Sequence, residues 1–189
     1  MSLKIFQRPL PYAPRLDRRC TDAITLIVIH CTELPDLVSA RVWGEKEIYR
    51  DSRTGNSGHF YIDRDGRVEE WVPVTRIAHH ARSFNRQSIG IELVNKGRFP
   101  HWFQSTHQQM EESYPEAQIR ALLDLLQHLE TDLPGLKEIA GHEDLDTDML
   151  PSEDQPGIMI RRKVDPGPCF PWQKIQDHTA LKRWSLKTP

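Results

Sequence analysis

Apolar residues are concentrated in two segments that predict buried β-strands. The run AITLIVIHC, residues 23–31, is almost unbroken and rich in β-branched side chains. Such a run is typical of a strand covered on both faces, in the middle of a sheet flanked by helices. The segment QSIGIELVN, residues 87–95, instead has apolar residues at alternate positions from Ile89, with Glu92 on the opposite face. The alternation predicts a second strand with one apolar face.

Other segments predict a hairpin and a long helix. GHFYIDRDGRVEEWVP, residues 58–73, contains two short strand patterns around the turn DRDG, which indicates a β-hairpin. The segment PEAQIRALLDLLQHLETDLP, residues 115–134, has proline at its first turn and after its end, and its apolar face is formed by Ile119, Leu122, Leu123, Leu126 and Leu129. Residues 37–51 have a weaker helical spacing.

The rest of the chain completes an α/β pattern. LKEIAGHED, residues 136–144, predicts a short strand that ends at a histidine, and residues 171–184 predict an amphipathic closing helix. Residues 1–22 are rich in Pro and Arg, and we expect an arm lying over a domain formed by residues 23–189. Strands interleaved with helices predict a single α/β domain with a mixed central β-sheet flanked by helices.

Composition narrows the possible partners and the compartment. The chain has 189 residues and a net charge of −2, which provides no electrostatic argument for nucleic acid or an anionic membrane as a partner. No apolar run approaches the roughly 20 residues that span a bilayer, and the N-terminus lacks the apolar block of a secretory signal. We therefore expect a cytoplasmic protein, although a phage protein released by lysis would have the same features. We also expect a monomer. Three cysteines without a C-x-x-C pair argue against a disulfide scaffold.

Two histidines and one aspartate are the first candidates for chemistry. His30 ends the buried strand, at the edge where α/β sheets usually place ligands, and His142 ends the segment IAGH. Asp165 lies in KVDPGP, a loop that proline and glycine stiffen. Each histidine alone is as well explained by a structural role, and the aspartate alone by capping a turn. Together, two histidines and a carboxylate are a common ligand set for catalytic zinc, with the fourth position left for water.

Six motifs carry a resemblance to a known family. They are IVIHCTE, GHFYIDRDGRV, AHHA, NRQSIGIELVN, AGHEDL and KVDPGPCFPW. Their order resembles that of the type-2 N-acetylmuramoyl-L-alanine amidases, a zinc-dependent family that includes T7-like phage lysozymes and peptidoglycan recognition proteins. The likeness is strongest to the AmpD-like branch, which recycles anhydromuropeptides. It covers roughly residues 24–172, implies the type-2 amidase fold, and makes residues 23–189 a zinc amidase domain.

The resemblance implies a role for each of five residues. His30, His142 and Asp165 match the family's Zn²⁺ ligands, and the aspartate is typical of the AmpD-like branch where phage members carry a cysteine. This ligand set leaves the bound ion a net positive charge, which favours ionisation of its water near neutral pH. Glu92 matches the catalytic acid/base. Lys163 matches a lysine that faces the scissile carbonyl and would stabilise the oxyanion. The alternative for both is a solvated surface position.

The resemblance also indicates candidates for substrate binding. His80 matches the histidine of the family's HA motif, which is expected near the substrate sugar or peptide. His79 replaces a residue that is often tryptophan, and we expect it in the wall of the site. Asn85 and Arg86 match a variable loop that could meet the carboxylates of the peptide.

This chain departs from the family pattern at two places. Position 58 is glycine where phage members carry a catalytic tyrosine, which gives Glu92 more weight. The insert 146–160 is longer than we expect between the second histidine and the lysine. It has two candidate roles, covering the site or altering which muropeptides fit.

The implied activity is hydrolysis of the amide bond between N-acetylmuramic acid and L-alanine, with a muropeptide or peptidoglycan fragment as the substrate. Recycling of anhydromuropeptides is the expected role. Two alternatives stay open: an endolysin of phage or prophage type that acts on intact cell wall, and a non-catalytic module that only binds muropeptide.

Overall fold

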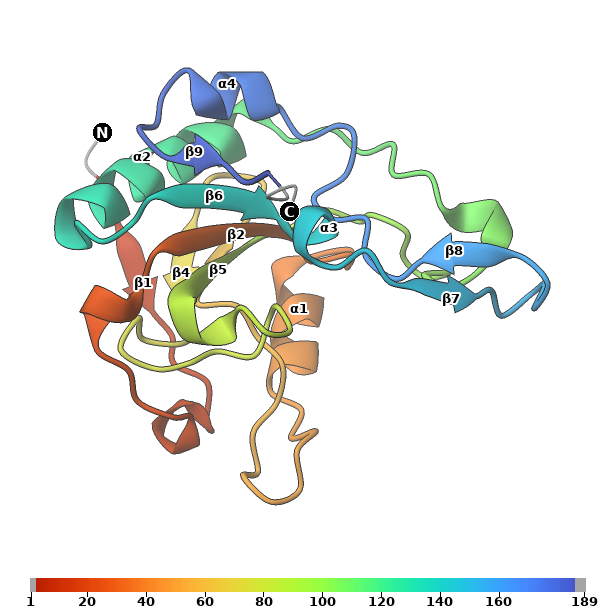
Figure 1. The fold of residues 1–189 in the computed structure, drawn as a ribbon, viewed down its shortest axis with the longest axis horizontal. Coiled ribbons are helices and arrows are strands. Elements are labelled where there is room, and N and C mark those ends of the chain that lie inside the picture. The colour runs from red at the N-terminus through yellow and green to blue at the C-terminus, as the bar shows by residue number, and fades with distance from the viewer. Residues whose placement is uncertain (1–2, 186–189) are drawn as a thin grey trace.

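A seven-stranded β-sheet organises the chain (Figure 1). In the computed structural model, which describes residues 3–185, the strand order is β1–β4–β3–β5–β2–β6–β9. The strands are β1 (Ile5–Gln7), β2 (Leu26–Cys31), β3 (Phe60–Ile62), β4 (Val68–Glu70), β5 (Ser88–Leu93), β6 (Glu138–Gly141) and β9 (Lys182–Arg183). All neighbours pair in parallel except β3 and β4, which form the predicted antiparallel hairpin. The prediction of a mixed central sheet is confirmed.

Helices cover both faces of this sheet. Figure 1 shows α2 (Glu116–Asp132) and α4 (Trp172–Gln176) on one side of the sheet and α1 (Leu37–Gly44) on the other. The short α3 (His142–Leu145) directly follows β6. Single 3₁₀ turns occupy Ala13–Arg15, Thr21–Ala23, Asn85–Gln87 and Ser105–His107. None of the helices in residues 3–185 is long and apolar enough to cross a membrane.

Strand β2 lies in the interior of the sheet, between β5 and β6, because both its faces are apolar. All six of its residues are buried. Ile27 and Ile29 pack into the core formed with the leucines of α2, whereas Leu26 and Val28 pack on the opposite face. Since side chains alternate along a strand, His30 projects to the same face as Val28, away from α2.

The long helix α2 packs much as its pattern predicts. Leu122, Leu126 and Leu129 are buried, while Leu125 takes the buried place that we expected for Leu123, which is partly exposed. The buried side chain of Gln118 donates from Nε2 to the carbonyl of Ile62, the last residue of β3, at 2.9 Å and to that of Val94, just after β5, at 3.0 Å. The helix is thereby bound to the carboxyl ends of β3 and β5, and β5 carries Glu92 of the site.

The predicted closing helix over 171–184 is wrong. Helix α4 ends at Gln176, and residues 182–183 form β9, paired in parallel with β6. The Glu130 carboxylate binds the Thr179 hydroxyl and the Ala180 N–H, so the chain turns back there. Because β6 would otherwise expose unpaired backbone groups at its edge, pairing outweighs the helical spacing.

Two further segments acquire structure. The insert contains a separate antiparallel hairpin of β7 (Met149–Pro151) and β8 (Met159–Arg161), which extends beyond the main sheet (Figure 1). In the predicted arm, β1 pairs with β4 at the edge of the sheet, and Leu10, Tyr12 and Leu16 are buried. Residues 1–2 of that arm and residues 186–189 of the predicted domain lie outside the described residues.

Candidate metal centre and active site

The carboxyl ends of β2, β5 and β6 bring the polar residues together. His30 is the penultimate residue of β2, and Glu92 is its register partner on β5. His142 follows the last residue of β6, the strand on the other side of β2. Because the three strands are parallel, their ends share one edge of the sheet, as the sequence indicates for such folds.

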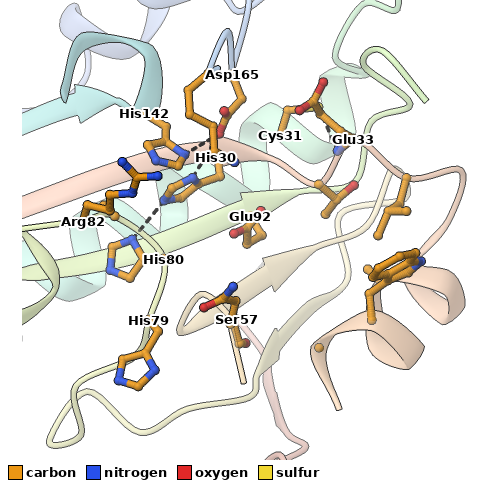
Figure 2. A pocket seen from close by; sticks show the side chains of 18 of the residues that line it. His30, Cys31, Glu33, Ser57, His79, His80, Arg82, Glu92, His142 and Asp165 are labelled. Carbon is orange, nitrogen blue, oxygen red and sulfur yellow. Dashed lines mark hydrogen bonds and ion pairs between the residues drawn. The ribbon is translucent and has the colours of Figure 1, made fainter. Parts of the chain in front are cut away.

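Asp165 completes a compact cluster with the two histidines (Figure 2). One of its carboxylate oxygens, Oδ2, lies 3.0 Å from His30 Nδ1 and 3.2 Å from His142 Nδ1. The three side chains are almost completely buried. The structure therefore unites three residues that the sequence separates by 135 and 23 positions.

The spacing of these donor atoms fits a tetrahedral metal ion. Two ligands that each lie about 2.0–2.1 Å from zinc are about 3.3 Å apart at the tetrahedral angle. The observed separations of 3.0 and 3.2 Å are close to that value. The donor set, its spacing and its burial therefore fit a metal site of the His-His-Asp type.

The electrostatics of the cluster favour the protonation states of metal ligands. Burial, together with repulsion from His142, lowers the pKa of His30 to about 4, although Asp165 opposes the shift. Burial alone would raise the pKa of Asp165, but His142, His30 and Lys163 outweigh it and hold that pKa well below its usual value. At neutral pH, His30 is thus neutral and Asp165 ionised, as metal ligation requires.

Glu92 has the opposite environment to Asp165. Burial raises the pKa of Glu92 to about 8, and the negative charge of Asp165 adds to the shift while Lys163 opposes it. The side chain lines the same cavity as the cluster. A cation bound beside it would favour its ionised form. The site thus contains two carboxyl groups whose pKa values are driven apart, an arrangement typical of acid/base chemistry.

Gly58 leaves room for the Glu92 side chain. A Cβ at position 58 would lie 2.8 Å from Glu92 Cγ and 3.1 Å from the Gly90 carbonyl oxygen. A side chain at position 58 would therefore displace Glu92 from its place in the cavity.

A cavity of about 670 Å³ opens over the cluster. Its cationic lining comes from Arg82, Arg162 and Lys163. Trp43 and Tyr49 also line it, and nearly half of each of these side chains is exposed. This size and mixture of aromatic and cationic groups suit a ligand with apolar faces and carboxylates.

The predicted substrate-binding residues occupy different positions. His79 and His80 line the cavity, and the His79 ring meets Tyr49 edge to face at 5.0 Å. Asn85 also lines it, but its Oδ1 accepts hydrogen bonds from the backbone N–H groups of His80 and Ala81. Arg86 is exposed and is not part of the cavity wall.

The sequence predictions missed several residues of the wall. Arg82 lines the cavity beside the HHA segment and forms an ion pair with Asp148 of the insert at 3.0 Å. Its position two residues after His80, a residue already predicted to bind substrate, could have indicated that Arg82 lies in the cavity wall. Trp43 and Tyr49 lie in the weakly periodic segment 37–51, where unpatterned aromatic residues are the corresponding signal.

Comparison with known proteins identifies the family. The profile of the N-acetylmuramoyl-L-alanine amidase family, Amidase_2, matches residues 21–168, which include the whole cluster. The chain belongs to this family. The expected type-2 amidase fold is thereby confirmed.

Individual relatives in the amidase family include a 1,6-anhydro-N-acetylmuramyl-L-alanine amidase and a phage endolysin. The chain is 28% identical to the 1,6-anhydro-N-acetylmuramyl-L-alanine amidase AmpD of Salmonella typhimurium, over 66% of this chain and 58% of that protein. It therefore spans little more than half the length of that relative. It is 29% identical to the endolysin of Escherichia phage T7, over 67% of this chain and 78% of the endolysin.

A solved structure of the family shares the fold. It is the amidase AmiD from E. coli in complex with the substrate anhydro-N-acetylmuramic acid-L-Ala-D-gamma-Glu-L-Lys. The match has a TM-score of 0.63 and 25% identity, and covers 87% of this chain and 60% of AmiD.

Proposed function

We propose that this protein is a zinc-dependent N-acetylmuramoyl-L-alanine amidase that cleaves the bond between N-acetylmuramic acid and L-alanine. One observation carries the proposal: a buried His-His-Asp cluster, a carboxyl group of raised pKa and a lysine all border one cavity in a chain of this family. His30, His142 and Asp165 would hold the Zn²⁺. When bound, the ion supplies Lewis acidity and lowers the pKa of water.

The protein's own groups would perform the proton transfers. Glu92, in its ionised form, takes a proton from the water that attacks the lactyl carbonyl carbon. The carbonyl oxygen gains negative charge, and the Lys163 ammonium, which borders the same cavity, stabilises it. Glu92 then gives its proton to the alanine nitrogen as the C–N bond breaks, so that the base is regenerated and the products are a carboxylic acid and an amine.

The proposed substrate is a soluble anhydromuropeptide, and the proposed setting is cytoplasmic recycling. Identity to AmpD supports this choice, as does the ligand in the AmiD structure. The exposed faces of Trp43 and Tyr49 suit the apolar face of a sugar, and Arg82 and Arg162 suit the carboxylates of a stem peptide.

An endolysin that acts on intact wall is the second candidate. It is favoured by the T7 endolysin match, which covers 78% of that protein. A module that only binds muropeptide is less consistent with the site, because all three candidate ligands are present and converge.

Hydrolysis of two substrates by the zinc-loaded protein separates these functions. We expect release of the peptide from soluble anhydromuropeptide at a much higher kcat/KM than from purified sacculi. Faster cleavage of sacculi would favour the endolysin. Binding without cleavage of either substrate, by a protein that contains zinc, would favour the binding module.

A further inference from the structure

A chain of hydrogen bonds leads from the backbone to His30 (Figure 2 shows its last link). The Ser88 hydroxyl lies 2.7 Å from the Phe84 carbonyl oxygen and 3.2 Å from His80 Nε2. His80 Nδ1, on the other side of that ring, lies 3.0 Å from His30 Nε2. The remaining ring nitrogen of His30, Nδ1, faces Asp165 in the candidate metal site.

The direction of every bond in this chain follows from its first member. A carbonyl oxygen can only accept, and a serine hydroxyl has a single hydrogen, so Ser88 donates to Phe84. Ser88 must then accept from an N–H at His80 Nε2. A neutral imidazole carries one N–H, so His80 Nδ1 is an acceptor and His30 Nε2 donates to it. By the same count, His30 Nδ1 has a bare lone pair.

The bare nitrogen of His30 faces another acceptor. It lies 3.0 Å from the Oδ2 oxygen of the Asp165 carboxyl group. Two acceptors at this distance repel each other unless a cation lies between them. The chain of hydrogen bonds therefore presents two lone pairs to the site, one from His30 Nδ1 and one from Asp165 Oδ2, and a cation can bind both. It disfavours the other tautomer, in which His30 Nδ1 carries the proton and donates it to Asp165.

We propose that His80 and Ser88 are positioning residues that hold His30 in the tautomer that binds the metal. The proposal rests on the zinc site of the proposed function. His80, which the sequence predicts only as a substrate-binding residue, would then also orient the metal ligand His30.

The backbone around His80 is built to accept its ring. A Cβ at Gly90 would lie 2.6 Å from His80 Cγ and 2.7 Å from its Nδ1, so only glycine leaves room for the ring against β5. Asn85 fixes the backbone of the same residue, since its Oδ1 accepts from the His80 N–H at 3.0 Å. Ser88 itself is completely buried.

Zinc affinity of substituted proteins tests the proposal independently of catalysis. A chelator-competition titration gives the Kd of the full chain and of His80→Ala, Ser88→Ala and His80→Asn. We expect His80→Ala to weaken zinc binding about 10–100-fold, as is usual for the loss of an outer partner of a metal ligand. Ser88→Ala should weaken it several-fold. His80→Asn should retain most of the affinity, because the amide oxygen can accept from His30 Nε2 at the place of Nδ1.

A matched control and a second measurement complete the test. His128→Ala removes an exposed histidine of α2 and should leave the Kd unchanged. In the metal-free wild type, long-range ¹H–¹⁵N NMR of the histidine rings should show the proton of His30 on Nε2. This reading does not depend on whether a variant folds.

The outcomes separate the two proposals. If the wild type binds no zinc, the proposed function fails. If the wild type binds zinc and both alanine variants bind it as tightly, or if the proton of His30 lies on Nδ1 in the metal-free protein, the positioning role is overturned while the zinc site stands.

Discussion

The pKa values of two carboxyl groups in the site are shifted in opposite directions by their surroundings. Asp165 faces two histidines and a lysine, and its pKa stays well below the usual value. Glu92 is partly buried, with Lys163 as the cation that opposes the effect of burial, and its pKa rises to about 8. Asp165 can therefore serve as a ligand that stays charged, while Glu92 can exchange protons near neutral pH.

The raised pKa of Glu92 predicts that the free energy of unfolding of the metal-free protein falls as the pH rises. Below pH 4.5, the usual pKa, the carboxyl group is protonated in both folded and unfolded chains. Between pH 4.5 and about 8 it ionises in the unfolded chain but not in the folded one, so wild-type stability falls over this window. Glu92→Gln is neutral throughout. Denaturant unfolding should find the variant increasingly more stable than the wild type from pH 5 to 8. A constant difference would contradict this environment for Glu92.

Removal of the lysine should affect the chemical step more than metal binding. Lys163→Ala should lower kcat about 10²–10³-fold, the usual effect of losing one group that stabilises an oxyanion. Steady-state kinetics and zinc content measure the two effects. A variant with normal kcat would exclude the assigned role, whereas loss of zinc would show that Lys163 mainly supports Asp165.

At the scale of elements, the site depends on one face of β5. Ser88, Gly90 and Glu92 occupy alternate positions on that face: the first bonds His80, the second admits its ring and the third enters the cavity. Gly58, before β3, completes the space for Glu92. A strand can align these groups because residues two apart point the same way.

A methyl group at position 58 therefore tests this alignment. Gly58→Ala should displace Glu92 and lower kcat at least tenfold, while the zinc Kd stays unchanged because the cluster is not touched. Unaltered kcat would mean that the strand tolerates the shift, and that the position of Glu92 is less critical than its geometry indicates.

A buried ion pair joins the β2 end to the segment that carries Lys163 and Asp165. The Arg98 guanidinium binds both oxygens of Glu33, at 2.7 and 2.9 Å, and donates to the carbonyls of Arg161 and Arg162. Arg98→Ala would leave the Glu33 carboxylate buried without its partner, and should destabilise the fold by about 3–5 kcal/mol. Glu33→Gln with Arg98→Met is the control that removes both charges. Equal losses in urea unfolding for the two proteins would contradict the assigned cause.

The sequence predicts the elements whose pattern agrees with their surroundings. The segments 23–31, 87–95 and 115–134 form β2, β5 and α2 because their apolar spacing matches the core that they fill. Residues 171–184 do not form the expected helix, because residues 182–183 form β9 and pair with the backbone groups at the edge of β6. No spacing rule could reveal that edge before the sheet was known.

For the candidate site, the sequence predicts the cluster residues but not the hydrogen bonds that hold them. The family motifs single out the cluster residues, which the structure brings together. The bond between His80 and His30 and its anchor at Ser88 were not predicted, because they depend on rotamers and on which faces meet across the sheet. The exposed Arg86 shows the converse case, in which a motif neighbour lies outside the cavity wall.

At the scale of the molecule, the metal site connects distant parts of the chain. Its candidate ligands come from β2, from the start of α3 and from the loop before α4. Zinc should bind the folded chain and not the unfolded one, and so should stabilise it by about 2.7 kcal/mol at a free concentration 100 times the Kd. Thermal unfolding with and without zinc measures this, with His30→Ala as the control that should show no gain. A gain that persists in the variant would indicate that zinc binds elsewhere.

The most direct test of the account is cleavage of the muramoyl–alanine bond by zinc-loaded wild type and Glu92→Gln, with zinc content measured on the same samples. We predict that both proteins contain about one zinc per chain, that the wild type releases L-alanyl peptide from anhydromuropeptide, and that the variant is slower by about 10²–10⁴-fold, as expected for loss of a general acid/base. Turnover by the variant at the wild-type rate, with a full complement of zinc, would contradict the proposed mechanism.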